Sequence, residues 1–194
     1  MPTVFVDIDT QLDFLYPAGA LYVPGAESIV PAIERLNRHA AAHGIPVIST
    51  TDSHTENDPE FTVWPPHCVA GTIGQHKPAG TLLEHRLVVP NQDAPISIER
   101  TRQIVVEKQT IDAFETRTLS HIVDTLCADR FVVYGVVTEI CVLMAARGLL
   151  ARGKQVVIVA DAVRALSEEK AAAAIREVRA VGGTVASLSE ILAS

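Results

Sequence analysis

The feature that most constrains the fold of this chain is a regular alternation of short apolar runs with longer stretches of helical period. The apolar runs have the length of β-strands and lie at residues 4–8, 45–50, 103–107, 130–137, 155–160 and 184–187. Stretches that suit amphipathic helices lie between them, at residues 26–43, 119–127, 139–152 and 167–181. Ser167 is the predicted N-cap of the last helix. Repeated strand–helix–strand units predict an α/β fold of three layers, α-β-α, with a mainly parallel, Rossmann-like central sheet flanked by helices.

Residues 52–91 differ from the rest of the chain. They are rich in His, Pro, Gly and acidic residues and show no sustained period. Segments of this length without regular structure are usually functional or disordered, and the Trp64-Pro65-Pro66 sequence favours an ordered one. The chain of 194 residues suits one domain with a full hydrophobic core. We therefore expect a single domain, 1–194, that contains a functional loop region at 52–91.

Charge and cysteine content narrow the class of protein. The formal net charge of −7, without a run of Lys or Arg, disfavours nucleic-acid and anionic-membrane partners. There is no apolar stretch of the roughly 20 residues that span a bilayer and no targeting signal, so a cytoplasmic location is expected. Cys68, Cys127 and Cys141 form no CxxC pair, which disfavours a disulfide framework and a cysteine-based zinc site.

Residues with reactive or metal-binding side chains follow several of the predicted strands. Each lies just past the carboxyl end of a strand, where ligands bind in parallel sheets. Asp9 and Asp13 follow the first strand, Asp52 and His54 the second; Lys108 follows the strand at 103–107, and Cys141 the strand at 130–137. We expect these side chains to meet at one edge of the sheet.

Cys141 is a candidate nucleophile because a buried strand turns into a helix beside it. Unpaired N–H groups and the dipole of a first helical turn would lower the pKa of its thiol and hold an oxyanion. An inert buried cysteine is the alternative. Asp9 would accept the thiol proton, and Lys108 would keep Asp9 ionised; the alternatives are a solvated acid and a surface lysine. Cys127 is expected in the core, and the role of Cys68 is open.

A second group of residues suits a metal ion. In an extended Asp-x-His sequence the two side chains share a face, so Asp52 and His54 would point together, with Glu60 and His67 as further ligands. Imidazoles with carboxylates suit Zn, Fe or Mn. A polar loop with exposed histidines is the alternative. Four other histidines are expected at the surface: His39, His43, His76 and His85.

A series of motifs in chain order resembles the isochorismatase-like cysteine hydrolases, a family that includes the nicotinamidases. Residues 9–14, Asp-Thr-Gln-Leu-Asp-Phe, resemble the D-x-Q-x-D-F motif of the family, and Asp52-Ser53-His54 resembles its D-x-H metal motif. Residues 64–72 resemble the W-P-x-H-C-V-x-G-T stretch of nicotinamidases. Lys108 and residues 135–142 match the catalytic lysine and the turn that carries the nucleophile.

The resemblance implies a catalytic triad of Asp9, Lys108 and Cys141. Cys141 would attack an amide carbon and form a thioester, while Asp9 would shuttle protons. The backbone N–H groups of Thr138 and Cys141 would form the oxyanion hole. A cis peptide bond is expected between Val137 and Thr138.

The resemblance also implies a divalent metal ion, Zn first and Fe or Mn as alternatives, bound by Asp52, His54, Glu60 and His67. The ion would hold the ring nitrogen of nicotinamide, and the residues in contact with the substrate would be Phe14, Trp64 and Gln11. Nicotinamide hydrolysis would give the protein a place in NAD salvage. Family members commonly assemble as dimers or tetramers, so a homo-oligomer is expected.

Other functions are open within the same family. Glu139-Ile140 stands where nicotinamidases usually carry Asp followed by an aromatic residue or His. One alternative is a metal-independent amidase or ureide hydrolase acting on another small amide or carbamoyl compound. Another is a catalytically silent member kept as a binding module, which the presence of acid, lysine and thiol disfavours. A dinucleotide-binding oxidoreductase is excluded because no G-x-G-x-x-G follows the first strand.

Overall fold

The computed structural model describes residues 1–92 and 95–193, which form a seven-stranded sheet in the order β3-β4-β2-β1-β5-β6-β7. All of the neighbouring strands are parallel. The strands are β1 (Thr3–Ile8), β2 (Val47–Asp52), β3 (Arg86–Val89), β4 (Gln103–Lys108), β5 (Arg130–Val136), β6 (Gln155–Arg164) and β7 (Thr184–Ala186). The predicted parallel sheet is therefore confirmed.

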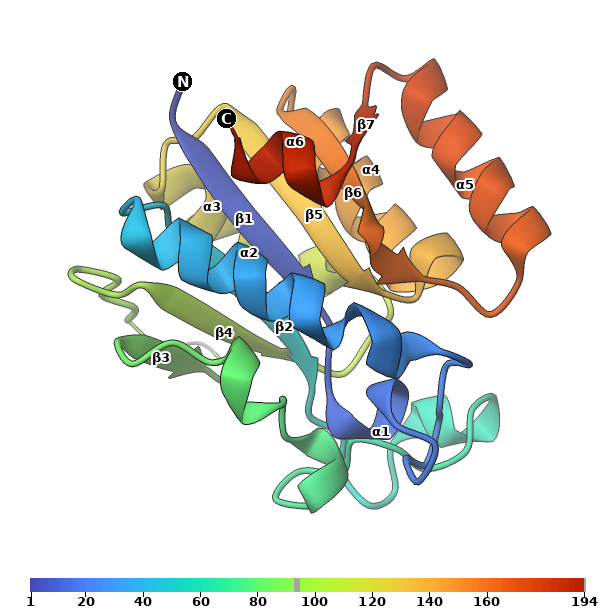
Figure 1. Ribbon diagram of the computed structural model, residues 1–194. Coiled ribbons are helices and arrows are strands. Elements are labelled where there is room, and N and C mark those ends of the chain that lie inside the picture. The colour runs from blue at the N-terminus through green and yellow to red at the C-terminus, as the bar shows by residue number, and fades with distance from the viewer. Residues whose placement is uncertain (93–94, 194) are drawn as a thin grey trace.

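Helices cover both faces of the sheet, as Figure 1 shows. On one face lie α1 (Leu12–Leu15), α2 (Val30–Ala42) and α6 (Leu188–Leu192), packed in one apolar cluster with Phe5 of β1. On the other lie α3 (Leu119–Thr125), α4 (Leu143–Ala151) and α5 (Glu168–Ala180), packed in a second cluster with Val4 and Val6. Successive residues of β1 thus serve opposite layers, the period-two pattern of a strand buried on both faces. The three-layer α-β-α fold is confirmed.

The segment 52–91 has more regular structure than its sequence indicates. It contains the edge strand β3 and three short 3₁₀ turns, at Pro59–Thr62, Ile73–Gln75 and Ala79–Thr81. Two further 3₁₀ turns lie outside it, at Ala26–Ile29 and Ala113–Glu115. Elements of three to five residues contain too few side chains to show a period, which is why the sequence did not indicate β3, α1 or α6.

Helix boundaries account for most of the other differences. Ser167 accepts a hydrogen bond from the backbone N–H of Lys170 at 3.3 Å, so the predicted N-cap is confirmed. The core location predicted for Cys127 is wrong, because α3 ends at Thr125 and Cys127 lies beyond it, exposed and with φ of 48°. The predicted helix 139–152 begins with a π turn, Thr138–Val142, and continues as α4.

The cis peptide bond lies one residue earlier than predicted. It joins Val136 to Val137, and the expectation of a cis bond between Val137 and Thr138 is wrong. The bond lies where the chain passes from strand β5 to the π turn. Strand β5 ends at Val136 and the π turn begins at Thr138, so Val137 alone connects them.

None of the helices in the described ranges combines the length and the apolar character needed to cross a membrane.

Gly135 allows the ends of β1 and β5 to approach each other closely. It has φ of 118° and pairs with Ile8, the residue immediately before Asp9. A Cβ atom at this position would lie 2.1 Å from the carbonyl oxygen of Ile8. Because that neighbour is backbone in the middle of a sheet, it cannot rotate away. Gly135 therefore helps to determine where the chain leaves β1.

We predict that Gly135→Ala lowers the free energy of unfolding by at least about 2 kcal/mol, because backbone strain and steric overlap add. Gly153→Ala is the matched control. Gly153 also has a positive φ, of 71°, but nothing lies within 4 Å of a Cβ there, so the loss should be about 1 kcal/mol. Urea unfolding measures both values. Equal losses in the two variants would contradict the close approach at Gly135.

Candidate active site

Four parallel strands bring reactive side chains to one edge of the sheet. Asp52 and Lys108 are the last residues of β2 and β4 and are register partners. Asp9 directly follows β1, and Cys141 lies in the π turn that follows β5. Because these strands are neighbours in the order β4-β2-β1-β5, the side chains meet as the parallel topology predicts.

The Lys108 ammonium lies between two carboxylates. Its Nζ atom is 2.9 Å from Oδ2 of Asp9 and also donates a hydrogen bond to Oδ1 of Asp52. Lys108 is only 1% exposed, and both acids are buried. The other oxygen of Asp9 accepts a hydrogen bond from the Thr50 hydroxyl at 2.6 Å. The alternatives of a surface lysine and a solvated acid are therefore excluded.

The pKa values of Asp9, Asp52 and Lys108 are shifted in different directions. Burial raises the pKa of Asp9 above its ordinary value, although Lys108 acts to lower it. Burial also acts to raise the pKa of Asp52, but Lys108, His54 and His67 together outweigh it and the pKa lies well below the usual range. Burial acts to lower the pKa of Lys108, but Asp52 and Asp9 outweigh it and the pKa lies well above normal. Asp52 is thus firmly ionised, whereas Asp9 is the more basic carboxylate.

Cys141 presents its thiol to a cavity beside these charges. Burial raises the pKa of the thiol well above its ordinary value, while Lys108 opposes this effect and Asp9 reinforces it through its charge and a hydrogen bond. The expectation that the first helical turn lowers this pKa is therefore wrong, because burial outweighs the favourable charge of Lys108. The resting residue is therefore a thiol, with Asp9 close enough to affect its pKa.

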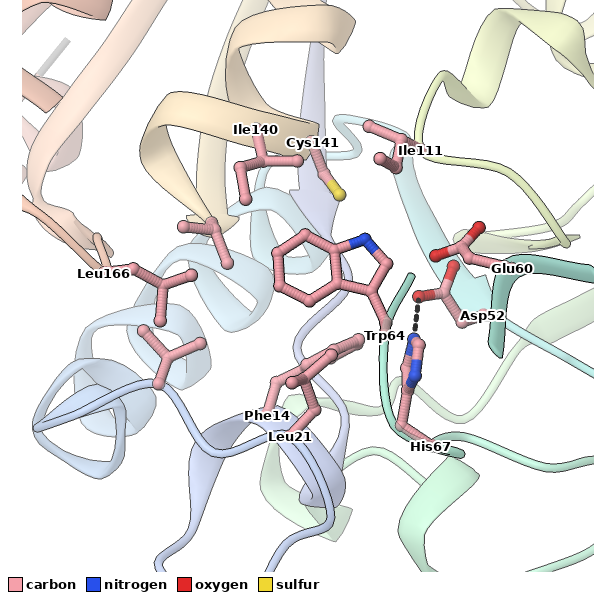
Figure 2. A pocket seen from close by; sticks show the side chains of 12 residues that line it. Phe14, Leu21, Asp52, Glu60, Trp64, His67, Ile111, Ile140, Cys141 and Leu166 are labelled. Carbon is pink, nitrogen blue, oxygen red and sulfur yellow. Dashed lines mark ion pairs between the residues drawn. The ribbon is translucent and has the colours of Figure 1, made fainter. Parts of the chain in front are cut away.

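Asp52, His54 and His67 form a compact group of possible metal ligands. One ligand atom of each lies within 4.8 Å of the others. Oδ2 of Asp52 is 3.8 Å from Nε2 of His54 and 3.7 Å from Nε2 of His67, the second contact being drawn in Figure 2. The alternative of exposed loop histidines is excluded here, since both rings are buried.

The donor atoms of the two rings suit a divalent metal ion. Nδ1 of His67 is 2.8 Å from the carbonyl oxygen of Pro65 and donates its proton there, while Nε2 faces Asp52. Both nitrogens of His54 are buried without a hydrogen-bond partner among the described residues. Imidazole nitrogens that face an ionised carboxylate are the donor set that Zn, Fe and Mn prefer.

Glu60 lies near this group without belonging to it. Its carboxylate lines the same cavity as Asp52, and the two acids point toward each other in Figure 2. Burial and the negative charge of Asp52 raise the pKa of Glu60. Its carboxylate is not among the ligand atoms that converge within 4.8 Å.

The cavity is lined by reactive side chains and by aliphatic ones. The reactive ones are Cys141, Asp52 and His67. The aliphatic lining residues come from several segments, including loops and the π turn that carries Cys141: Leu21, Val23, Ile111, Ile140 and Leu166. The predicted ring-binding residues Phe14 and Trp64 both line the cavity, and the Trp64 indole extends across it below Cys141 in Figure 2.

Gln11, which was predicted to contact the substrate, binds backbone groups beside the cavity instead. Its side-chain oxygen accepts a hydrogen bond from the N–H of Asp52 at 2.7 Å, and its amide donates to the carbonyl oxygens of Asp52 and Gln75 at 2.8 Å. It does not line the cavity. The prediction of a substrate contact is corrected, because these backbone bonds engage both ends of the amide. Gln11 instead holds Asp52 in place.

The remaining histidines and cysteines lie away from the cavity. His43, His76 and His85 are exposed and His39 is half-buried, in agreement with a surface location. Cys68 is buried, and burial raises the pKa of its thiol far above the usual range. All three cysteines are free.

Sequence reasoning missed Asp58, which lies 3.1 Å from the ring of His54. It also accepts a hydrogen bond from the N–H of Glu60, as the N-cap of the 3₁₀ turn at Pro59–Thr62. Two signals were available in the sequence. An aspartate before a proline is a typical helix start, and Asp58 lies four residues after a predicted ligand.

The fold and this site define a class of three-layer α/β protein whose reactive side chains converge beyond the carboxyl ends of parallel strands. The isochorismatase domain matches residues 3–77 and 91–190, and the chain belongs to that family.

Several similar proteins within the family are amidases. The nicotinamidase of Escherichia coli (strain K12) is 26% identical, with 97% of this chain and 96% of the relative covered. The pyrazinamidase of Pyrococcus horikoshii, crystallised in complex with zinc, superposes with a TM-score of 0.79 at 28% identity, covering 96% of this chain and 99% of that one. The N-carbamoylsarcosine amidase of Thermoplasma acidophilum superposes with a TM-score of 0.77 at 25% identity, covering 97% of both. The chain is thus an amidohydrolase of this family that resembles nicotinamidases at low identity.

We predict that Lys108→Met lowers the free energy of unfolding by about 3–5 kcal/mol, because it leaves Asp9 and Asp52 buried without their common cation. Adding Asp9→Asn to this variant should restore part of the loss. Arg147→Met, which removes an exposed ion pair with Glu177, is the control and should have little effect. Urea unfolding is the measurement. A Lys108→Met variant as stable as the control would argue against the buried bridge.

Proposed function

We propose that this protein hydrolyses nicotinamide to nicotinate and ammonia through a thioester on Cys141. The observation that carries this proposal is the position of Asp52. One of its oxygens binds Lys108, which also binds Asp9, and the other faces the two histidines. Cys141 and two of the proposed metal ligands, Asp52 and His67, line one cavity, and Asp9 is joined to them through Lys108. An enzyme needs this combination if it is to hold a heteroaromatic ring while attacking its amide.

The first half of the reaction forms the thioester. Asp9 accepts the proton of the Cys141 thiol as the sulfur attacks the amide carbon and a carbon–sulfur bond forms. The backbone N–H groups of Thr138 and Cys141 would stabilise the oxyanion that develops on the amide oxygen. Asp9 then gives its proton to the amide nitrogen, the carbon–nitrogen bond breaks and ammonia leaves. The raised pKa of Asp9 supports this role, since a more basic carboxylate accepts the thiol proton more readily.

The second half consumes water. Asp9 takes a proton from a water molecule whose oxygen attacks the thioester carbon. The carbon–sulfur bond breaks, and the proton returns from Asp9 to the sulfur. Lys108 holds the Asp9 carboxylate in place throughout, because its ammonium also binds Asp52 and has no freedom to turn away.

The residues that would hold the metal ion are Asp52, His54 and His67, with Glu60 beside them. The bound ion would supply a Lewis acid that holds the nitrogen of the substrate ring. Zinc is the proposed metal, with iron and manganese as alternatives, because imidazole and carboxylate ligands suit all three and the Pyrococcus horikoshii relative was crystallised with zinc. Phe14 and Trp64 would flank the flat ring.

We expect ammonia release from nicotinamide that stops after chelation and returns when zinc is added back. The reason is that the ring nitrogen has no other partner of comparable strength in a cavity with largely aliphatic walls. An enzyme-coupled ammonia assay measures the rate, and metal analysis of the chelated protein checks that the ion has left. Activity that persists in metal-free protein would disprove the role of the ion.

Cys141→Ala should lower turnover by at least about a thousandfold, because the nucleophile is lost. The fold should persist, since alanine is well tolerated at the start of a helix. Cys127→Ala, which removes the exposed thiol, is the matched control and should keep the parent rate. Ammonia release and thermal unfolding are measured on both variants. A Cys141→Ala enzyme with near-parent activity would remove Cys141 from its role.

A second candidate is a metal-independent amidase acting on a carbamoyl compound. The observation in its favour is the similarity to the N-carbamoylsarcosine amidase of Thermoplasma acidophilum, which is close to that of the nicotinamidase relatives. The chelation experiment separates the two. Cys141-dependent ammonia release from carbamoyl compounds in metal-free protein, without activity on nicotinamide, would favour this candidate.

A further inference from the structure

The ring of His54 lies between two carboxylates. Its Nε2 atom is 3.8 Å from Oδ2 of Asp52, and its Nδ1 atom is 3.1 Å from Oδ2 of Asp58. His54 is 0% exposed, and Asp58 is 9% exposed. The Phe61 ring packs against the imidazole with centroids 5.2 Å apart, which limits its rotation. Each nitrogen of His54 therefore faces its own carboxylate.

The second oxygen of Asp58 has a different partner. Oδ1 accepts a hydrogen bond from the N–H of Glu60 at 3.0 Å, and the carbonyl oxygen of Asp58 accepts one from the N–H of Phe61 at 3.0 Å. These bonds begin the 3₁₀ turn that carries Glu60. One carboxylate thus joins His54 to the segment that brings Glu60 to the cavity.

The position of Asp58 bears on which nitrogen of His54 is free. A neutral imidazole carries one proton, and only the other nitrogen has a lone pair for a metal ion. Both nitrogens of His54 face a carboxylate, but Nδ1 lies closer to Asp58, at 3.1 Å, than Nε2 lies to Asp52, at 3.8 Å. The shorter distance favours the tautomer with the proton on Nδ1. His67 has the same arrangement, because its Nδ1 faces the carbonyl oxygen of Pro65 at 2.8 Å and its Nε2 faces Asp52. The Asp58 carboxylate and the Pro65 carbonyl oxygen thus each face the Nδ1 atom of a histidine whose Nε2 atom is directed toward Asp52.

We propose that Asp58 is a positioning residue of the metal site, which holds the proton of His54 on Nδ1 so that Nε2 can bind the ion. This inference rests on the metal site proposed above. Partners of this kind behind a metal-binding histidine raise metal affinity by fixing its tautomer and orientation. Asp58 itself does not bind the ion, since its two oxygens face His54 and the N–H of Glu60.

The experiment separates the two roles of Asp58 by substitution. Asp58→Ser keeps a good N-cap acceptor for the turn but removes the partner of His54. Asp58→Asn keeps the cap and places an amide where the carboxylate was. Glu56→Gln is the matched control, because it removes one negative charge from an exposed side chain of the same loop. His54→Ala reports the loss of a ligand. Zinc affinity is measured on each full-length protein by competition with a chelator.

We expect Asp58→Ser and Asp58→Asn to weaken zinc binding by about 10- to 100-fold, and Glu56→Gln to leave it unchanged. Nitrogen-15 NMR of the His54 ring in zinc-free protein at alkaline pH should find the proton on Nδ1 in the parent and on both nitrogens, in exchange, in Asp58→Ser. A role limited to the cap would leave this signature unaltered.

Two results would overturn the inference, and they are distinguishable. If zinc binds equally well to the parent and to Asp58→Ser but not to His54→Ala, the metal site stands and the role of Asp58 is wrong. If the parent and His54→Ala both fail to retain zinc, the proposed metal site is wrong, and the role of Asp58 with it.

Discussion

The buried ammonium of Lys108 is the interaction on which the rest of the site depends. Removing an ion from water costs several kcal/mol, so a lysine at 1% exposure is stable only with close partners. Asp9 and Asp52 supply them because β4, β2 and β1 are adjacent and end at the same level. The single positive charge of Lys108 thereby compensates two negative charges, that of Asp9, the base of the proposed reaction, and that of Asp52, a ligand of the proposed metal. Its contact with Asp52 keeps that acid ionised, while burial leaves Asp9 basic enough to exchange a proton.

Long periodic elements were predictable from the sequence, and short ones were not. The apolar steps of residues 26–43 and the continuous run of 130–137 are repeated often enough to reveal a helix and a buried strand. The edge strand β3 has four residues and one buried side chain, Val89, so its pattern carries no period. Cys127 was misplaced for a related reason. Its spacing continues that of α3, but the helix ends at Thr125 and Cys127 itself has a positive φ.

Within the site, position was more predictable than chemistry. Asp9, Asp52, Lys108 and Cys141 meet because parallel strands end at one edge, a rule that needs only the order of elements. The pKa of Cys141 depends instead on how deeply the thiol is buried, which no local motif states, and so its direction was predicted wrongly. The same holds for Gln11. Its motif marks it as part of the site, but only the structure reveals that both ends of its amide bind backbone.

The reactive groups and the cavity walls belong to different parts of the fold. Asp52 and Lys108 lie on strands and Asp9 directly after one, where the hydrogen-bonded sheet restricts their movement. The aliphatic walls come from loops: Leu21 follows α1, Ile111 follows β4 and Leu166 follows β6. Loops tolerate substitution far better than central strands do. The sheet therefore fixes the positions of the groups proposed to react with the amide. The loop residues would determine which substrates fit the cavity, and they can change without disturbing Lys108 and its two carboxylates.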